Sequence, residues 1–179
     1  MTTTLFTNVH IATGMPGSTA AETTPLQDIL VEDGRFKKIG QRLVAKLATQ
    51  GMDISSIETI DLEGKLACPP FCDTHLHLDY VFTARKPGAV NESGTLFEGI
   101  QRWSETKSDL TVDEVKERAK IGIAKEMRHG VQFIRSHADV TDPNLTSLKA
   151  LLELKEELKD TVTLQIVSFP QEGMYSYEG

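Results

Sequence analysis

The sequence predicts an α/β protein in which a small sheet domain precedes a region of alternating strands and helices. Over residues 1–65, short segments rich in β-branched and aliphatic residues are separated by turn signals. Over residues 66–179, apolar runs of strand length alternate with amphipathic patterns of helical period. Because strands that alternate with helices form parallel sheets with right-handed crossovers, we expect three consecutive βα units in this second part.

Two hairpins are expected in the first part, each with an acidic residue followed by glycine at its turn. The small sheet that they form would need further strands to close its core. The expected elements are strands at 5–11, 28–32 and 35–40 with the turn at Asp33-Gly34, and a second hairpin of 57–62 and 65–67 around Glu63-Gly64.

The second part should begin with a strand at 66–73, which is apolar enough to be buried on both faces. Cys68 and Cys72 lie in this run with two prolines between them. Four extended residues span about 13 Å, which is beyond the reach of a disulfide. We therefore expect buried free thiols, rather than a redox pair or half of a zinc site.

Helices and strands then alternate. The helix after residue 110 has the clearest limits, because Thr111 and Glu114 form a capping box and Gly130 suits a glycine cap. We expect a helix at 95–107, strands at 131–140 and 163–169, one buried face made of Val115, Ala119, Ile123 and Met127, and a helix that starts at Asp142-Pro143 with a stripe of Leu145, Leu148, Leu152, Lys155 and Leu158.

Composition excludes several functions. The chain has 179 residues, a formal net charge of −7, 39% hydrophobic and 25% charged residues, which is typical of a soluble globular protein. The negative charge argues against binding to nucleic acid or to a membrane surface, because both need clustered Lys and Arg. No secretory signal or membrane-spanning run is visible, so a cytoplasmic location is expected.

The segment with the most chemistry is Phe71-Cys-Asp-Thr-His-Leu-His-Leu-Asp79, at the end of the first apolar strand. In a strand, residues i and i+2 point to the same face, so the imidazoles of His75 and His77 should project together. Two neutral imidazoles so placed can hold one divalent metal ion. Their position also fits, because functional residues of (β/α)8 barrels gather at the carboxyl ends of the strands.

This segment resembles the first-strand signature of the amidohydrolase superfamily. Further motifs are similar to those of the cytosine deaminase family within it, and the resemblance runs from about residue 62 to the end. It implies the N-terminal part of a metal-dependent hydrolase (β/α)8 barrel over 66–179, preceded by a partial β-sandwich domain over 1–65. The further motifs are Ser93-Gly-Thr-Leu-Phe-Glu-Gly-Ile-Gln-Arg-Trp103, Arg135-Ser-His-Ala-Asp-Val140 and Leu164-Gln-Ile-Val-Ser-Phe-Pro-Gln-Glu-Gly173.

The resemblance also implies a function and a site. His75 and His77 would be ligands of one divalent ion, iron or zinc, and Gln171 would hydrogen-bond the edge of a pyrimidine. The complete enzyme would deaminate cytosine to uracil and ammonia in pyrimidine salvage, with a small-molecule substrate and as a homo-oligomer. The family's proton-shuttling glutamate, its catalytic histidine and aspartate and a third metal-binding histidine would lie beyond Gly179, so residues 1–179 alone are expected to be inactive.

Two alternatives remain open. One is an amidohydrolase that acts on aminated triazines such as isopropylammelide, which shares the His-x-His start and a similar second strand. The other is a non-catalytic fragment or one partner of a split barrel. Among other polar residues, Arg135, His137 and Asp139 should form a network on one face of their strand, whereas Asp79 could orient a neighbour or cap a helix.

Overall fold

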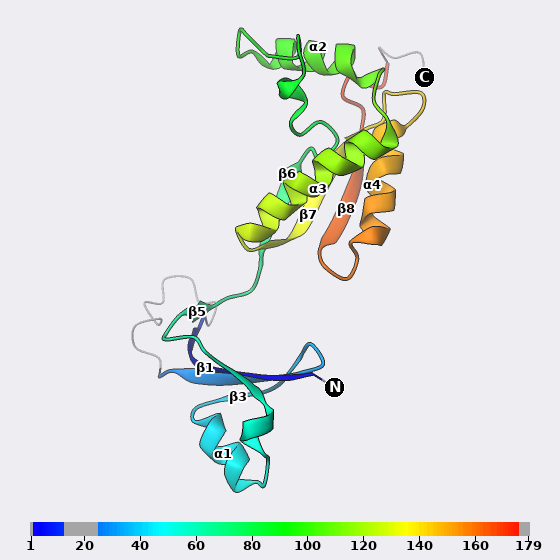
Figure 1. The fold of residues 1–179 in the computed structure, drawn as a ribbon. Coiled ribbons are helices and arrows are strands. Elements are labelled where there is room, and N and C mark those ends of the chain that lie inside the picture. The colour runs from blue at the N-terminus through cyan, green and yellow to red at the C-terminus, as the bar shows by residue number, and fades with distance from the viewer. Residues whose placement is uncertain (1, 13–24, 176–179) are drawn as a thin grey trace. The chain divides into compact units, whose positions relative to one another are not determined.

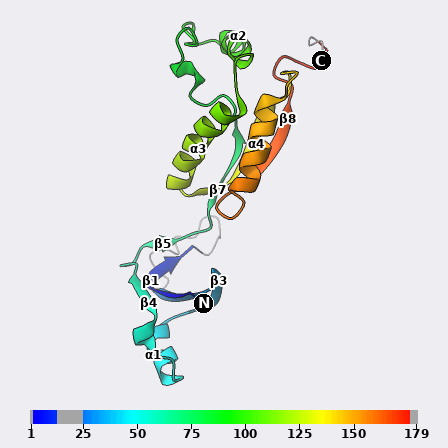
Figure 2. The same cartoon turned by 45° about the vertical axis from the view of Figure 1, so that its right-hand side comes forward.

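The computed structural model describes residues 2–12 and 25–175, and it divides the chain into two compact units, Met1–Pro69 and Pro70–Gly179. Figure 1 and Figure 2 show the strands of the first unit and the strands and helices of the second. Within the described ranges, no helix combines the length and the apolar character needed to cross a membrane.

The first unit is built on one sheet in the order β3-β2-β1-β4, and β5 also pairs with β1. The Asp33-Gly34 hairpin is confirmed, with φ of 49° and 73° at the two residues, as a type I′ turn requires. The elements are β1 Thr3–Ile11, β2 Gln27–Glu32, β3 Arg35–Gly40, α1 Leu43–Thr49, a 3₁₀ turn η1 Ile54–Ser56, β4 Glu58–Asp61 and β5 Leu66–Ala67.

The second expected hairpin is wrong. Both β4 and β5 pair with β1 in parallel, so the chain continues in one direction along the same edge. Asn8 of β1 has a φ of 55°, and its carbonyl oxygen accepts a hydrogen bond from the amide of Gly64 at 2.7 Å. The Glu63-Gly64 turn therefore separates β4 from β5 along one edge of the sheet, and it does not reverse the direction of the chain.

Helix α1 was not expected from the sequence, and it supplies part of the core of this unit. Leu43 and Leu47 pack against Leu5 of β1 and Leu30 of β2. The carboxylate of buried Asp28 accepts a hydrogen bond from the amide of Leu43 at 2.7 Å, so it satisfies a backbone donor at the start of the helix.

The second unit contains a parallel sheet in the order β6-β7-β8. Helices α3 and α4 pack side by side on one face, and α2 lies at the carboxyl ends of the strands (Figures 1 and 2). The elements are β6 Phe71–Leu76, a 3₁₀ turn η2 Thr83–Arg85, α2 Leu96–Lys107, α3 Val112–Arg128, β7 Val131–Asp139, α4 Thr146–Glu157 and β8 Thr163–Phe169.

Helix α3 forms as its sequence predicts. The hydroxyl of Thr111 accepts a hydrogen bond from the amide of Glu114 at 3.2 Å, and Gly130 has a φ of 85° after the last turn. Its buried face contains Val115, Ala119 and Ile123, which join the residues of the sheet and of α4 in the core.

Helix α4 departs from its expected start and face. It begins at Thr146, because the carboxylate of Asp142 accepts a hydrogen bond from the amide of Thr146 at 2.8 Å and Leu145 has a φ of 52°. Leu151 and Leu154 are fully buried against the sheet, and Ala150 is fully buried against Trp103 and Val115. Of the expected stripe, Leu145 and Leu152 are exposed, whereas Leu148 and Leu158 pack at the margin of the core.

The first strand of this unit is shorter and more exposed than expected. Pro69 and Pro70 donate no amide hydrogen, so they interrupt the ladder, and the run 66–73 is divided between β5 and β6. Strand β6 is paired on one side only, with β7, and most of its residues are exposed. Cys68 and Cys72 are free thiols, as expected, but both are exposed and not buried.

An extra residue in β6 determines which side chains face away from the helices. Asp73 pairs with Ile134 and Leu76 with Ser136, so three residue steps along β6 stand opposite two along β7. A regular strand would place Asp73 and His75 on one face, the face covered by the helices. The bulge reverses this alternation, and it brings His75 to the open face of the sheet.

Candidate functional site

The two histidines of the first strand lie close together on the open face of the sheet. His75 is the penultimate residue of β6 and His77 follows its end. Their ring centroids are 5.3 Å apart with an angle of 57° between the planes. His137, which projects from the same face of β7, contacts both rings. The bulge in β6 is therefore what places the pair against the second strand.

His77 is oriented by the backbone of the neighbouring strand. Its Nδ1 atom lies 3.0 Å from the carbonyl oxygen of His137, which accepts only, so Nδ1 carries the proton in this hydrogen bond. The proton on Nδ1 leaves Nε2 with a lone pair. Burial lowers the pKa of His77, and the neighbouring His75 and His137 also act in this direction, which favours the neutral ring.

His137 stacks on His75 and is not arranged to share a ligand with it. The two rings are 4.1 Å apart with an angle of 23°, so the planes lie face to face. Within the described part of the chain, no group of three or more His, Cys, Asp and Glu side chains is disposed to hold a metal ion. The candidate metal centre in this unit is therefore the pair of His75 and His77.

The network expected for Arg135, His137 and Asp139 on β7 does not form, because each of the three side chains has different partners. The guanidinium of Arg135 donates from Nε to the side-chain oxygen of Gln165 at 2.7 Å, within the open face of the sheet. Asp139 is buried at the end of the strand and bonds instead to helix α2 and the loop after β7. His137 lies between them against the histidine pair.

Asp79 is fully buried beside this pair. One carboxylate oxygen accepts a hydrogen bond from the amide of Asp139 at 2.8 Å, and the other lies 4.0 Å from Nδ1 of His77. Burial raises the pKa of Asp79 to about 7. The guanidinium of Arg118, in α3, donates to the carbonyl oxygens of Asp79 and Val81 at 3.0 and 2.8 Å. Asp79 is thus part of a connection between the loop after β6 and the end of β7.

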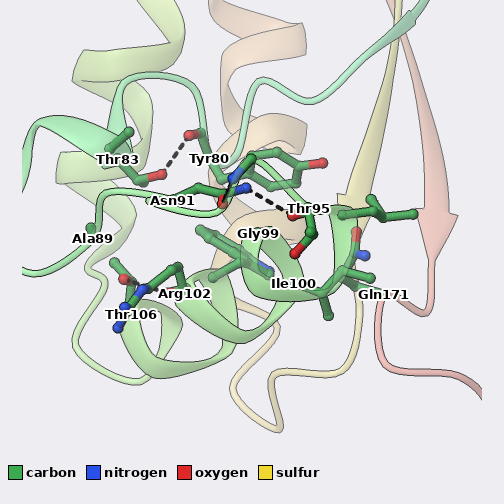
Figure 3. Close-up of a pocket in the computed structure, with 14 residues that line it drawn as sticks. Tyr80, Thr83, Ala89, Asn91, Thr95, Gly99, Ile100, Arg102, Thr106 and Gln171 are labelled. Atoms are coloured by element: carbon green, nitrogen blue, oxygen red, sulfur yellow. Dashed lines mark hydrogen bonds between the residues drawn. The ribbon is translucent and has the colours of Figure 1, made fainter.

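A cavity of about 470 Å³ lies between the loop after β6, helix α2 and the turn after β8. Gln171 is one of its lining residues, and Figure 3 shows it on the side next to the end of β8, with Thr83 and Ala89 on the opposite side. Apolar walls come from Leu96, Ile100 and the ring of Trp103. A largely apolar cavity with a few polar groups is typical of small-molecule sites.

Aromatic contacts connect the histidine pair to this cavity. The ring of His77 stacks on Tyr80 at 4.6 Å, and Tyr80 contacts Trp103 at 4.9 Å. Tyr80 and Trp103 both line the cavity, although His75 and His77 do not. The structure therefore brings Gln171 and His77 to the same end of the sheet, with Tyr80 between the pair and the cavity.

Sequence reasoning assigned no role to Tyr80 or to the loop that follows it. In that loop, the carboxamide of Asn91 donates to the carbonyl oxygen of Thr95 at 2.8 Å and accepts from the amide of Gly94 at 2.8 Å. The sequence Asn91-Glu-Ser-Gly94 is a signal of such a turn, but nothing in it indicates that this turn borders a cavity. Trp103 is buried in α2 and contacts Tyr80.

Comparison with known proteins identifies relatives of this chain. The sequence pattern of the amidohydrolase family matches residues 58–179. N-isopropylammelide isopropyl amidohydrolase of Pseudomonas sp. (strain ADP) is 33% identical over 122 residues, which are 66% of this chain and 30% of the relative.

Solved structures have the same fold. The 5-methylcytosine deaminase of Klebsiella pneumoniae, liganded with 5-fluorocytosine, matches with a TM-score of 0.79 and 39% identity, over 97% of this chain and 38% of that one. N-isopropylammelide isopropylaminohydrolase of Burkholderia multivorans ATCC 17616 matches with a TM-score of 0.73 and 26% identity, over 100% of this chain and 40% of that one. The expected fold, the start of a (β/α)8 barrel after a small β domain, is confirmed by these likenesses.

Proposed function

Because this chain belongs to the amidohydrolase family and matches the N-terminal portion of its cytosine deaminase-like members, we propose that the protein carrying it hydrolyses the amino group of cytosine or a close aminopyrimidine. The observation that carries this proposal is the placement of His77 and Gln171 at one end of the sheet, next to a cavity of about 470 Å³. The likeness to a 5-methylcytosine deaminase that holds 5-fluorocytosine supports the substrate class.

The histidine pair fits a divalent metal ion. The hydrogen bond from Nδ1 of His77 to a carbonyl oxygen is the outer contact that metal-ligating histidines usually make, and it fixes the tautomer with Nε2 available. Iron and zinc both accept imidazole nitrogen, and a neutral ring is the binding form. We assign His75 and His77 as ligands of one such ion.

The bound ion would lower the pKa of a water molecule toward neutrality and so supply the nucleophile. His75 and His77 would fix its position at the open face of the sheet. Hydrolysis replaces the exocyclic amino group of the base by the oxygen of water and releases ammonia. Burial raises the pKa of Tyr80 to about 12, so its hydroxyl remains protonated, and its neutral ring contacts both His77 and Trp103 of α2.

Gln171 suits recognition of a pyrimidine edge. A carboxamide both donates and accepts, so one side chain can match adjacent C=O and N–H groups of a base. Its backbone is held by Asp139, which accepts from the amide of Gln171 at 3.4 Å. The apolar wall of Leu96, Ile100 and Trp103 fits the faces of a flat ring.

A second candidate substrate is an aminated triazine. It is favoured by the 33% identity to the N-isopropylammelide amidohydrolase of Pseudomonas, although the solved isopropylaminohydrolase from Burkholderia is less similar to this chain than the 5-methylcytosine deaminase. Both substrate classes are flat heterocycles with an exocyclic amine, so the same two histidines would serve either.

The two substrates are distinguished by their products. The complete protein is incubated with cytosine, 5-methylcytosine and N-isopropylammelide, and ammonia and isopropylamine are measured separately. We expect ammonia from the two pyrimidines at a kcat/KM at least about tenfold above that for the triazine, a difference of about 1.4 kcal/mol in transition-state stabilisation. Release of isopropylamine as the faster reaction would replace the pyrimidine assignment by the triazine one.

The control for this assay is a matched pair of histidine substitutions. A protein with His75→Ala and His77→Ala should release neither amine, whereas His129→Ala, at the exposed end of α3, should behave as the wild type. Amine release that survives the double substitution would show that a contaminating activity, or another site, is responsible.

A further inference from the structure

Asp139 occupies the point at which three parts of the candidate site meet. It is 1% exposed at the end of β7. One carboxylate oxygen accepts from the indole N–H of Trp103 at 2.6 Å, and the other accepts from the hydroxyl of Thr141 at 2.6 Å and from the amide of Gln171 at 3.4 Å. A single carboxylate is therefore bonded to helix α2, to its own loop and to the turn after β8.

The neighbouring Lys107 also connects helix α2 to the loop after β7 and to the turn after β8. Its ammonium donates to the hydroxyl of Thr141 at 2.7 Å and lies 3.5 Å from a carboxylate oxygen of Asp139. It also forms an ion pair of 2.8 Å with Glu172, the residue after Gln171. The turn that carries Gln171 is thus tied to α2 both through Asp139 and through the Lys107–Glu172 pair.

The charge on Asp139 is maintained despite its burial. Burial acts to raise the pKa of Asp139, but hydrogen bonds from Thr141 and Trp103 and the positive charge of Lys107 outweigh it, and the net shift is downward. A charged acceptor forms stronger hydrogen bonds than a neutral one, so these contacts fix the geometry of their donors more firmly than an amide would.

We infer that Asp139 is a positioning residue, which holds Gln171 in the orientation needed to bind the substrate base. This inference rests on the proposed function, because it deepens the role of Gln171 in that site. Asp139 does not line the cavity, whereas Gln171 and Trp103 both do. It therefore acts through them and makes no contact with the base itself.

The test is a double-mutant cycle in the complete protein, with Asp139→Asn, Gln171→Ala and the combination of both. Asparagine has the shape of aspartate, but it presents an N–H₂ group to one set of donors and removes the charge. We expect Asp139→Asn to raise KM about tenfold with kcat changed less than about threefold, and to add little when Gln171 is already alanine. Effects that multiply in the double variant would overturn the inference, because they would show independent action.

The matched control is Asp28→Asn. Asp28 is also a buried carboxylate, and it accepts from the backbone amides of Asn8 and Leu43 in the first unit. It should leave KM unchanged, and metal content should be that of the wild type in both aspartate variants. An equal rise of KM in Asp28→Asn would assign the effect to general destabilisation and overturn the inference.

Hydrogen exchange tests, without any measurement of turnover, whether Asp139 holds the turn that carries Gln171. The amides of residues 171–173 should exchange at least about tenfold faster in Asp139→Asn, while those of α3 remain protected. If α3 also loses protection, the same comparison is made with Glu172→Gln, which removes one anchor of the turn and leaves Asp139 in place. Unchanged exchange at 171–173 would overturn the inference.

The two proposals fail in different ways. A wild-type protein that turns over none of the pyrimidines or triazines contradicts the proposed function, and the exchange measurement then decides whether Asp139 holds the turn. A wild-type enzyme that is active, with Asp139→Asn kinetically unchanged, keeps the function and excludes the positioning role.

Discussion

The imidazole of His77 and the carbonyl group of His137 form a hydrogen bond of 3.0 Å between the end of β6 and strand β7. Because a carbonyl oxygen can only accept, this bond assigns the proton of the ring to Nδ1 and the lone pair to Nε2. The backbone of β7 therefore sets the tautomer of a side chain that lies just after β6.

Substitution of either histidine should remove most of the bound metal. In the complete protein, His75→Ala and His77→Ala each delete one nitrogen ligand, and the incomplete set of ligands that remains should hold the ion weakly. Elemental analysis of protein purified with iron or zinc should show well under half of the wild-type metal in both variants, and the full amount in His129→Ala. Wild-type stoichiometry in both variants would contradict the ligand assignment.

Gln171→Ala should keep the metal and lose substrate recognition. Leaving polar edges of a base unpaired costs about 1–3 kcal/mol per group, so kcat/KM should fall about ten- to a hundredfold. Gln101→Ala, on the exposed side of α2, is the control and should have wild-type kinetics. Steady-state kinetics with cytosine compares the two, and an unaffected Gln171→Ala enzyme would reduce this glutamine to an ordinary turn residue.

Two leucines of α4 should differ strongly in their contribution to stability. Leu154 is 0% exposed and Leu152 is 47% exposed. Leu154→Ala should lower the free energy of unfolding by about 2–5 kcal/mol through lost burial and a cavity, whereas Leu152→Ala should cost less than about 1 kcal/mol. Urea unfolding of the two variants measures this, and the reverse order would mean that the helix packs with its leucine stripe inward.

Stability should depend on the ionisation of Asp142. Burial acts to raise its pKa, but hydrogen bonds from Thr146 and Asn144 outweigh it and the net shift is downward. A carboxyl with a lower pKa in the folded state stabilises the fold above its unfolded pKa of about 3.9, and this stabilisation disappears as the pH falls through the folded pKa. The unfolding midpoint of Asp142→Asn should therefore be below that of the wild type at pH 7.

At acid pH the two proteins should converge. The difference in urea midpoint should shrink as the pH is lowered from 7 toward 3, because the wild-type carboxyl becomes protonated. Asp160→Asn, an exposed carboxylate in the turn before β8, is the control and should leave the midpoint unchanged at both pH values. A gap between Asp142→Asn and the wild type that is constant with pH would point to lost shape complementarity instead of lost charge.

Local signals in the sequence predicted much of the second unit. Thr111 and Gly130 lie at the ends of α3 as their capping chemistry requires, and the strand and helix order followed from hydrophobic period. The same reasoning was wrong for the first unit at Glu63-Gly64, because a turn signal does not specify whether the next strand pairs with its predecessor or with β1. Pairing partners are a property of the whole sheet.

The candidate site was predictable in its residue types and less so in its geometry. The spacing of His75 and His77 indicated a shared face, but it did not indicate whether this is the open face of the sheet or the face covered by the helices. The answer depends on an extra residue between Asp73 and Leu76, and such a bulge appears only when β6 is paired with β7. The part played by Tyr80 depends on ring contacts between segments distant in sequence, and no local pattern encodes these.

The bulge in β6 has a consequence for how this segment can change during evolution. Substitutions at Cys72 or Thr74 alter the exposed face of the strand and leave the backbone count as it is, so the segment should tolerate them readily. If β6 paired regularly with β7 at its present length, His75 would stand opposite Ser136 and its imidazole would face α3 and α4. The irregular pairing of this segment should therefore vary far less than its composition.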